Sequence, residues 1–288
     1  MEENNKFLKK ATGLLIVEVR NSNPNGDPDR ESDPRQRFDD RGEISPVSFK
    51  RKIRDLVGNT DGPVWQEISS QFSPELKPEN FCILESRGRD RPAILKEIEK
   101  QDKTFELKYW DGRIFGNTFL EAGSSTTIKT GVVQFGMGLS ISPVEIERQT
   151  NTNKAGVQEG MDRGMAPLGY RIVSHGVYTI PFFVNPTAAT KSGCTQKDVD
   201  LLLKIIPYAY SHTASYVRPS VGIRHAWYIE HKSMLGSCSD FDLLDALTPK
   251  KKEESEKPSF SWDEYAVPVA LPQELQDKVE PLRDLVAE

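Results

Sequence analysis

The pattern of apolar and polar positions is most regular near the N-terminus, where it predicts a strand followed by a long loop. Residues 13–20, GLLIVEVR, alternate with the two-residue period of a strand, which places Leu15, Val17 and Val19 on one face. Residues 21–43 are crowded with Asn, Asp, Pro, Gly and Arg, a composition that favours turns. We therefore expect a long polar loop after the strand, of a kind that is often functional in compact domains.

A helix with well-marked ends should follow this loop. Ser45 fits the N-cap, Pro46 the first helical position and Gly58 the C-terminal stop. At about 100° per residue, three basic side chains project within one arc opposite the apolar side chains, and these are Lys50, Arg51 and Arg54. Such an arc beside an Asn-rich loop suits a run of phosphates, although a charge cluster more often means a solvated helix face.

The middle of the chain alternates between mixed and strand-like segments. Residues 59–110 scatter proline and charge among short apolar pieces and predict an insertion of irregular helices. Residues 132–144 and 172–184 have strand character. Between them, residues 145–167 are polar and contain several glycines, which predicts an extended hairpin or a flexible arm.

A second helix and a further strand complete the predicted elements. Thr195, with Asp198 three residues on, has the form of a capping box that begins a helix. Residues 225–231 have the composition of a strand, and the charged run at 249–258 predicts a solvated linker. The order of strands and helices resembles the βαββαβ plan of ferredoxin-like and RRM folds, a plan that serves many functions.

The composition is that of a globular protein without a membrane segment or disulfides. Hydrophobic residues make up 36% and charged residues 28% of the 288 residues. No apolar run approaches the roughly 20 residues of a membrane span, and the polar N-terminus lacks the apolar core of a signal peptide. The three cysteines include no CxxC pair, which indicates a reducing cytoplasm and neither a disulfide framework nor a common zinc site.

Charge is divided unevenly along the chain. The net charge of -5 is unfavourable for a protein that would bind nucleic acid by neutralising phosphates. The tail from Ser239 onward holds 13 acidic and 6 basic residues, so the rest of the chain carries a net charge of +2. The body is therefore nearly neutral with local basic clusters, and composition alone leaves RNA binding open.

The long loop contains residues suited to bind phosphate or metal. Asn21, Asn23 and Asn25 can offer donors to phosphate and sugar oxygens, and plain turn chemistry explains them equally well. Three aspartates invite comparison with a calcium loop, namely Asp27, Asp29 and Asp33. That pattern fails because Ser32 stands at the glycine position and Phe38 at the final glutamate position. One or two of these aspartates could still serve a magnesium-dependent nuclease.

Other catalytic and cofactor signatures are missing from the sequence. The four histidines are scattered without the spacing of a zinc protease. No phosphate-binding loop, dinucleotide-binding motif or serine-hydrolase elbow occurs. We therefore expect no cofactor and no bound metal.

The predicted polar arm contains few apolar residues. Met161 and Met165 lie among Arg148, Lys154 and Arg163. An apolar tip on a polar arm can wedge between bases or dock on a neighbouring copy of the chain. A loosely anchored surface loop would have the same composition.

Several segments resemble one protein family, in the same order along the chain. RNSNPNGDPD and SPVSFKRKIRDLV resemble the N-terminal signature of the backbone subunit of type I CRISPR surveillance complexes, known as Cascade. WDGRIFG, HGVYTIPFFVNP, RPSVGIR and WYIEHKSMLG resemble later segments of the same subunits. The likeness covers residues 13–236 and is nearest to the I-C and I-B branches.

The resemblance implies an α+β fold with the shape of a right hand. It implies a modified RRM or ferredoxin-like palm, a helical fingers insertion and a β-hairpin thumb in a single elaborated domain, residues 1–288. The palm would comprise residues 11–58, 111–144 and 171–236, the fingers 59–110, the thumb 145–170 and a C-terminal extension 237–288.

The resemblance also implies a non-catalytic subunit that polymerises along crRNA, binds its sugar-phosphate backbone and presents its bases to a target DNA strand. Further partners would be neighbouring copies and the handle-binding, large and small subunits, with no membrane. The expected RNA-binding side chains are Arg20, Asn21, Asn23, Asn25, Lys50, Arg51, Arg54, Gln134, Arg148, Lys154, Met161, Arg163, Met165, Arg218 and Arg224.

Two alternatives belong to other functional classes. A type III-like backbone subunit would cleave target RNA with a loop aspartate, here Asp27 or Asp29. A globular interaction protein would have no nucleic-acid role and would purify without RNA.

Overall fold

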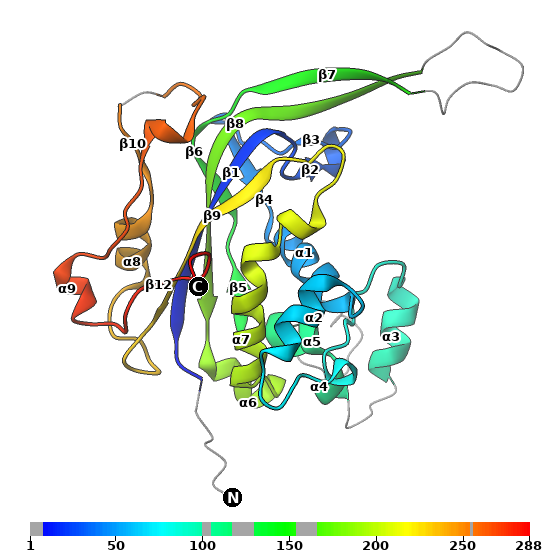
Figure 1. Ribbon diagram of the computed structural model, residues 1–288, viewed down its shortest axis with the longest axis vertical. Coiled ribbons are helices and arrows are strands. Elements are labelled where there is room, and N and C mark those ends of the chain that lie inside the picture. The colour runs from blue at the N-terminus through cyan, green and yellow to red at the C-terminus, as the bar shows by residue number, and fades with distance from the viewer. Residues whose placement is uncertain (1–7, 100–104, 117–129, 154–165, 254–255) are drawn as a thin grey trace, which may run out of the picture.

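An antiparallel sheet of eight strands runs through the centre of the computed structural model, which describes residues 8–99, 105–116, 130–153, 166–253 and 256–288 (Figure 1). In chain order its strands are β1 (Ala11–Ser22), β4 (Arg41–Ile44), β5 (Val133–Phe135), β6 (Gly138–Pro143), β7 (Ile146–Asn153), β8 (Ala166–Val184), β9 (Val221–Glu230) and β12 (Arg283–Asp284). Their spatial order is β12-β9-β1-β8-β6-β4, and β5 and β7 also pair with β8.

β1 lies inside the sheet and is buried on both faces along most of its length. It pairs with β8 on one side and with β9 on the other. Leu15 and Val17 belong to the core under the helices, whereas Leu14 and Ile16 belong to a second core under the C-terminal segment. The predicted strand and its two faces are confirmed, because alternation determines which side chains share a face whatever covers that face.

The polar segment after β1 is more ordered than a simple loop. β2 (Gly26–Asp27) pairs with β3 (Asp33–Pro34) around a single turn of 3-10 helix at Pro28–Arg30. β4 then joins the sheet beside β6, with Gly42 and Ile44 buried. The prediction of one long loop is wrong for these strands, since turn-forming residues also occur in short strands, here paired within the segment (β2 with β3) or with a distant strand (β4 with β6).

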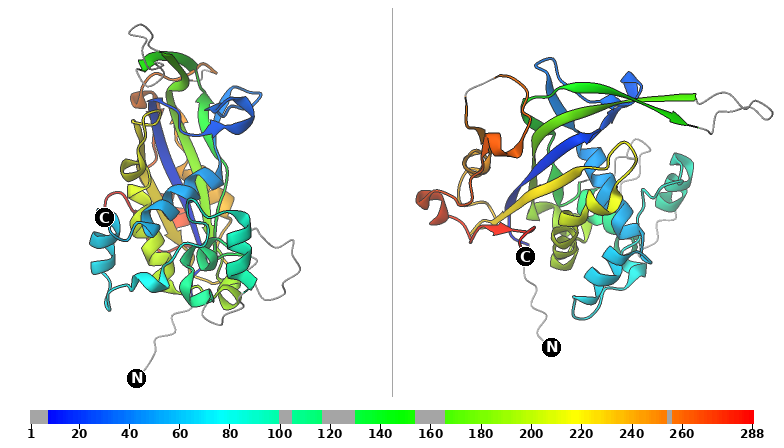
Figure 2. Two further views of the ribbon diagram at one scale, coloured as in Figure 1. Left: turned by 90° about the vertical axis from the view of Figure 1, so that its right-hand side faces the viewer. Right: turned by 45° about the horizontal axis from the view of Figure 1, so that its top comes forward.

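Helices cover one face of the sheet (Figure 2). The central helix α1 (Pro46–Gly58) begins as predicted, with Ser45 Oγ accepting a first-turn N–H at 3.2 Å. α7 (Gln196–Ile205) begins with the predicted capping box, in which the Thr195 N–H donates to Asp198 at 2.7 Å. The other helices of this layer are α2 (Pro63–Ser70), α3 (Arg91–Glu99), α4 (Phe105–Lys108), α5 (Trp110–Phe115) and α6 (Ala189–Ser192). Within the described residues, no helix is long and apolar enough to cross a membrane.

The predicted strand at 132–144 is divided in two. β8 pairs Phe135 with Phe182 but Leu139 with Thr179, so one extra residue bulges between β5 and β6. Beyond β6, β7 and β8 leave the sheet as a two-stranded hairpin (Figures 1 and 2).

This hairpin confirms one of the two forms predicted for the polar arm. Its pairing runs from Ile146 opposite Val173 to Asn153 opposite Ala166. Residues 154–165, which contain the predicted tip, lie outside the described residues.

The C-terminal segment covers the other face of the sheet (Figure 1). It contains α8 (Asp240–Leu247), β10 (Lys250–Lys251), β11 (Tyr265–Ala266) and α9 (Gln273–Gln276) before β12. Leu243 and Leu247 pack against Leu14, Ile16 and other apolar residues of the sheet. The prediction of a solvated linker is wrong at β10, which pairs with β11. The chain is held in a strand there because the segment as a whole packs against the apolar face of the sheet.

Candidate nucleic-acid interface

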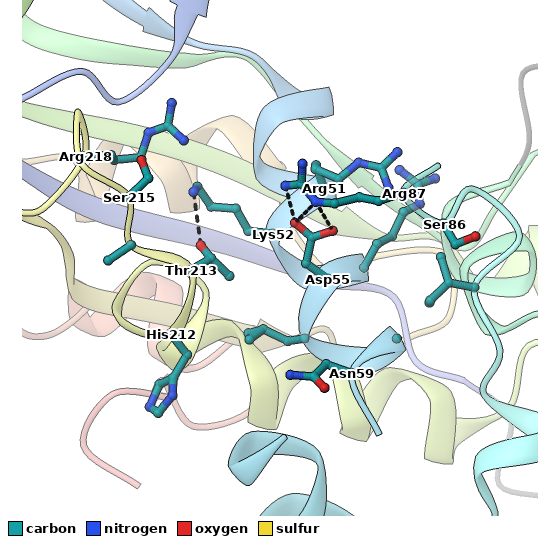
Figure 3. A pocket seen from close by; sticks show the side chains of 15 residues that line it. Arg51, Lys52, Asp55, Asn59, Ser86, Arg87, His212, Thr213, Ser215 and Arg218 are labelled. Atoms are coloured by element: carbon teal, nitrogen blue, oxygen red, sulfur yellow. Dashed lines mark hydrogen bonds and ion pairs between the residues drawn. The ribbon is translucent and has the colours of Figure 1, made fainter. Parts of the chain in front are cut away.

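A groove of about 730 Å³ runs along α1 and is rich in basic side chains. Figure 3 shows it with Arg51, Lys52 and Asp55 on α1, between Arg87 on one side and Arg218 on the other. Its remaining polar lining comes from Arg54, Asn59, Ser86, His212, Thr213 and Ser215. Because the groove has one carboxylate among several cations, its charge suits an anionic chain such as a phosphate backbone.

Lys52 lines the groove and is buried. Its Nζ donates to Thr213 Oγ1 at 3.1 Å and lies 4.8 Å from the centre of the Tyr210 ring. Burial, together with the charge of Arg218, lowers the pKa of Lys52 to about 8. Burial disfavours the charged form of this lysine, and an anion that approaches its ammonium group would stabilise that form.

Arg51 and Lys50 diverge from the single arc that the sequence predicted. Arg51 lines the groove and its guanidinium donates to the Glu85 carbonyl. Lys50 lies beside β5 instead, with Nζ 3.5 Å from Gln134 Oε1 and 5.2 Å from the centre of the Phe115 ring. Burial, followed by the charge of Arg54, lowers the pKa of Lys50 to about 8.

Arg54 corrects the predicted arc, because it is buried rather than exposed. Only 5% of Arg54 is accessible, and its Nε donates to Asp111 Oδ2 at 3.0 Å. Asp111 also accepts from the backbone N–H groups of Leu84 and Glu85, at 2.7 and 3.1 Å. This pair therefore ties α1 to α5 and to the middle of the insertion. A buried ion pair of this kind is a structural contact, so Arg54 does not belong to the exposed basic arc that the sequence predicted.

Arg87 is a groove residue that sequence reasoning missed. Its side chain is 74% exposed and donates to both carboxylate oxygens of Asp55. It lies in the insertion of residues 59–110, where the sequence has no periodicity that would show which charged residues share a face. Only the fold shows that it faces α1.

Of the predicted loop asparagines, Asn23 and Asn25 build the loop instead of presenting their amides to solvent, whereas Asn21 is exposed. Asn23 and Asn25 are buried. Asn23 Nδ2 donates to the Ser32 carbonyl at 2.8 Å, and Asn25 Oδ1 accepts from the backbone and hydroxyl of Ser45 at 2.9 and 2.8 Å. Asn21 has φ of 43°, a left-handed conformation that asparagine tolerates. Turn chemistry thus accounts for the observed contacts of these side chains.

Arg218 links this loop to the groove. Its Nε donates to the Asn23 carbonyl at 2.7 Å while the side chain lines the groove. Burial lowers the pKa of Arg218, which nonetheless stays charged at neutral pH, as arginine does.

The loop aspartates do not converge. Asp27 Oδ1 accepts from the Asp29 N–H at 3.1 Å, and Asp33 pairs with Arg171 of the hairpin at 2.7 Å. Within the part of the chain that the structure describes, no group of three His, Cys, Asp or Glu residues could hold a metal ion.

The remaining predicted residues lie away from the groove. Arg20 and Arg224 both contact Glu18, at 2.7 and 3.5 Å, and Arg224 lies 4.6 Å from the centre of the Trp262 ring in the C-terminal segment. Arg148 is an exposed residue of β7 and lines a smaller cavity of about 260 Å³ at the root of the hairpin. Lys154, Met161, Arg163 and Met165 lie outside the described residues.

The known proteins that resemble this chain include solved structures and one protein family. None of the curated proteins matches the chain. A solved chain titled "CRISPR RNA-guided surveillance complex, pre-nicking" is 13% identical over 77% of this chain and 78% of its own length, with a TM-score of 0.48. Another, titled "CRISPR RNA-guided surveillance complex", is 14% identical over 77% of this chain and 69% of its own, with a TM-score of 0.45.

Both of these structural likenesses are distant, and the assignment rests on the sequence instead. The sequence pattern of the family described as CRISPR-associated protein Cas7 matches residues 9–270, which is most of the chain. The chain therefore belongs to the CRISPR-associated protein Cas7 family.

Proposed function

We propose that this chain is a non-catalytic backbone subunit of a type I CRISPR surveillance complex and holds crRNA by its sugar-phosphate backbone. The observation that carries the proposal is the groove along α1, where Arg51, Lys52, Arg87 and Arg218 surround a single Asp55. A guide must be held by phosphate and sugar, because its base edges must stay free for pairing. The resemblance of the sequence to the I-C and I-B branches gives the subtype of the proposal.

The arrangement of elements supports a hand-shaped subunit. The order β9-β1-β8-β6, with α1 after β1 and α7 after β8, is the strand order of a ferredoxin-like or RRM palm. The helices α2, α3 and α4 would form the fingers, and the β7–β8 hairpin the thumb. Hairpins of successive copies would then meet neighbouring palms along the guide, with target DNA and the other subunits bound to that assembly in the cytoplasm.

Repetition explains how a nearly neutral subunit can bind a polyanion. Each copy contributes a short row of cations, and affinity accumulates over adjacent copies on one guide. The loop aspartates support a role without catalysis, since Asp27 caps a turn and Asp33 pairs with Arg171.

The groove is tested by neutralising the half-buried Arg51 and the exposed Arg87. We expect Arg51→Gln and Arg87→Gln each to reduce the slope of log affinity against log salt by about 0.7 to 1 unit, the effect of losing one phosphate contact. The loss should be equal for RNAs of unrelated sequence. Lys191→Gln is the matched control, because Lys191 is an exposed cation of α6 that does not line the groove.

Two results would contradict the proposal. Wild-type protein that purifies with its neighbours but without RNA would favour an interaction protein. Regularly spaced cuts in target RNA that disappear in Asp27→Ala or Asp29→Ala would favour the type III-like alternative.

A further inference from the structure

A chain of buried polar side chains crosses the sheet on the face that the C-terminal segment covers. Five side chains take part: Glu18, Ser142, His175, Ser259 and Tyr265. Each of them belongs to a residue that is no more than 5% exposed. Buried polar groups are costly unless they are hydrogen-bonded, so a continuous chain of this length calls for a structural reason.

The bonds of this chain follow one direction. Tyr265 donates to Ser259 Oγ at 2.8 Å, and Ser259 lies 2.8 Å from His175 Nδ1. His175 Nε2 lies 3.3 Å from Glu18 Oε1. At the other end, Ser142 Oγ lies 2.6 Å from the Tyr265 hydroxyl. With the imidazole proton on Nε2, Ser259 and Tyr265 each donate once and accept once, and Ser142 donates to Tyr265 at the end of the chain.

The carboxylate at the end of the chain is also satisfied. Besides contacting the imidazole, the Glu18 carboxylate forms ion pairs with Arg20 Nε at 2.7 Å and with Arg224 Nε at 3.5 Å. Arg224 in turn lies 4.6 Å from the centre of the Trp262 ring, which belongs to the same C-terminal stretch as Ser259. That stretch is therefore attached at more than one point.

Two members of the chain come from a compact loop, residues 256–266, which we call the strap. Lys251 closes the loop by donating to the Lys257 carbonyl at 2.8 Å and pairing with Glu264 at 3.6 Å. Glu264 also accepts from the N–H groups of Phe260 and Ser261, at 2.6 and 3.0 Å. These internal bonds let the strap dock on the sheet as a unit.

The position of the two contacts on the sheet is what gives the strap a role. His175 lies on β8 two residues after Val173, the last residue of β8 that pairs with β7. Ser142 lies on β6, which leads into β7 at Ile146. The strap therefore bonds to both strands that lead into the β7–β8 hairpin. Its Ser259 contacts His175 on β8, and its Tyr265 contacts Ser142 on β6.

We propose that the strap is a clamp that fixes the direction in which the hairpin leaves the sheet. A two-stranded ribbon has little rigidity of its own, so its direction depends on what holds its root. The clamp itself follows from contacts within this chain, and only its consequence for assembly rests on the proposed function of the hairpin.

The clamp is tested by amide hydrogen exchange at the hairpin root. Tyr265→Phe keeps the ring and removes the hydroxyl that joins Ser259 to Ser142. The variant loses two buried hydrogen bonds, so we expect amides near Ile146 and Val173 to exchange about fivefold or more faster, since one such bond is worth about fivefold. Ser259→Ala should have the same effect. Amides of α7 serve as an internal reference, because global destabilisation would accelerate them equally.

Tyr178→Phe is the matched control. It removes the hydroxyl of a fully buried tyrosine on the same strand as His175, and that hydroxyl has no hydrogen-bond partner in the part of the chain that the structure describes. In this variant, the amides at the hairpin root should exchange at the wild-type rate. Equal exchange in Tyr265→Phe and Tyr178→Phe, or equal acceleration of root and α7 amides in Tyr265→Phe, would overturn the clamp.

A second readout separates the clamp from the proposed function. If the hairpin acts between copies, Tyr265→Phe should shorten the assemblies that form on single-stranded RNA of mixed sequence, as judged by their mass in light scattering. Faster exchange at the root with assemblies of wild-type size would retain the clamp and overturn the assembly role of the hairpin.

Discussion

Lys50 and Lys52 differ from ordinary surface lysines in a way that can be measured. Burial first, and then the charge of a neighbouring arginine, lower the pKa of each from 10.5 to about 8. Both side chains are therefore mostly charged at pH 7 and mostly neutral at pH 9. Only the charged form neutralises a phosphate.

This shift predicts that RNA binding weakens between pH 7 and pH 9, below the range in which ordinary lysines titrate. We expect the salt slope to fall by roughly one to two units, one for each lysine that contacts a phosphate. Arginine stays charged throughout, so Lys50→Arg with Lys52→Arg should remove the pH dependence. Fluorescence anisotropy at several salt concentrations provides the measurement, and an unchanged wild-type slope at pH 9 would exclude both lysines from the contact.

Neighbouring cations of α1 have different roles because of residues far away in the sequence. Arg51 opens onto the groove, whereas Arg54, one turn later, pairs with Asp111 of α5. Helical spacing predicted that both would share a face, and this is nearly correct for the helix alone. The position of Asp111 decides which of the two remains available to a ligand.

At the scale of elements, the β7–β8 hairpin is supported by few contacts at its root. The described part of β7 pairs only with β8, and residues 145–150, at the start of the hairpin, are mostly exposed. Such an extension is stable only if a partner or a clamp orders it, because a two-stranded ribbon is marginal in water.

Shortening the hairpin should therefore separate folding from assembly. We expect a variant in which an Asn-Gly turn joins Thr150 to Gly169 to melt at the wild-type temperature, because the core residues of β8 beyond Val173 are untouched. Assemblies on RNA should be shorter or absent. Calorimetry of the monomer and light scattering of the RNA complex check the two halves. A large loss of melting temperature would mean that the hairpin belongs to the core.

At the scale of the whole molecule, the sheet is the middle of three layers. Helices cover one face, and the acidic C-terminal segment covers the other (Figure 1). The second layer buries Leu14, Ile16, Val177, Trp227 and Ile229 of the sheet. The charged run at 249–258 predicted only a solvated linker, yet the apolar residues of the segment pack on this face.

Removing the C-terminal segment should abolish folding. Exposure of these five side chains forfeits roughly 1.5–3 kcal/mol each, and the sum of about 10 kcal/mol equals the whole stability of a typical domain. We expect residues 1–238 to be insoluble or unfolded by circular dichroism. Leu243→Ala provides a graded test, with a loss of about 2–5 kcal/mol in denaturant unfolding. A soluble, cooperatively folding fragment 1–238 would show that the segment is a separate appendage.

Local patterns in the sequence were sufficient for the elements and for the family. The strand at 13–20, the helix that begins after Ser45, the capping box at Thr195 and the hairpin after residue 145 all appear where they were predicted. These features depend on neighbours within a few residues, through alternation, capping and turn chemistry. The ordered segments that resemble Cascade backbone subunits likewise led to the family that the sequence comparison identifies.

Tertiary structure alone decided which polar side chains remain available and what the C-terminal segment does. Asn23, Asn25 and Arg54 are engaged inside the protein, while Arg87 and Lys52 line the groove. Apart from Asn23, whose partner Ser32 is nine residues away, each outcome depends on a partner 20 or more residues away, which a local pattern does not contain. The same holds for the buried chain from Glu18 to Ser142, because its members come from four separate segments and become neighbours only when the sheet forms and the strap docks on it.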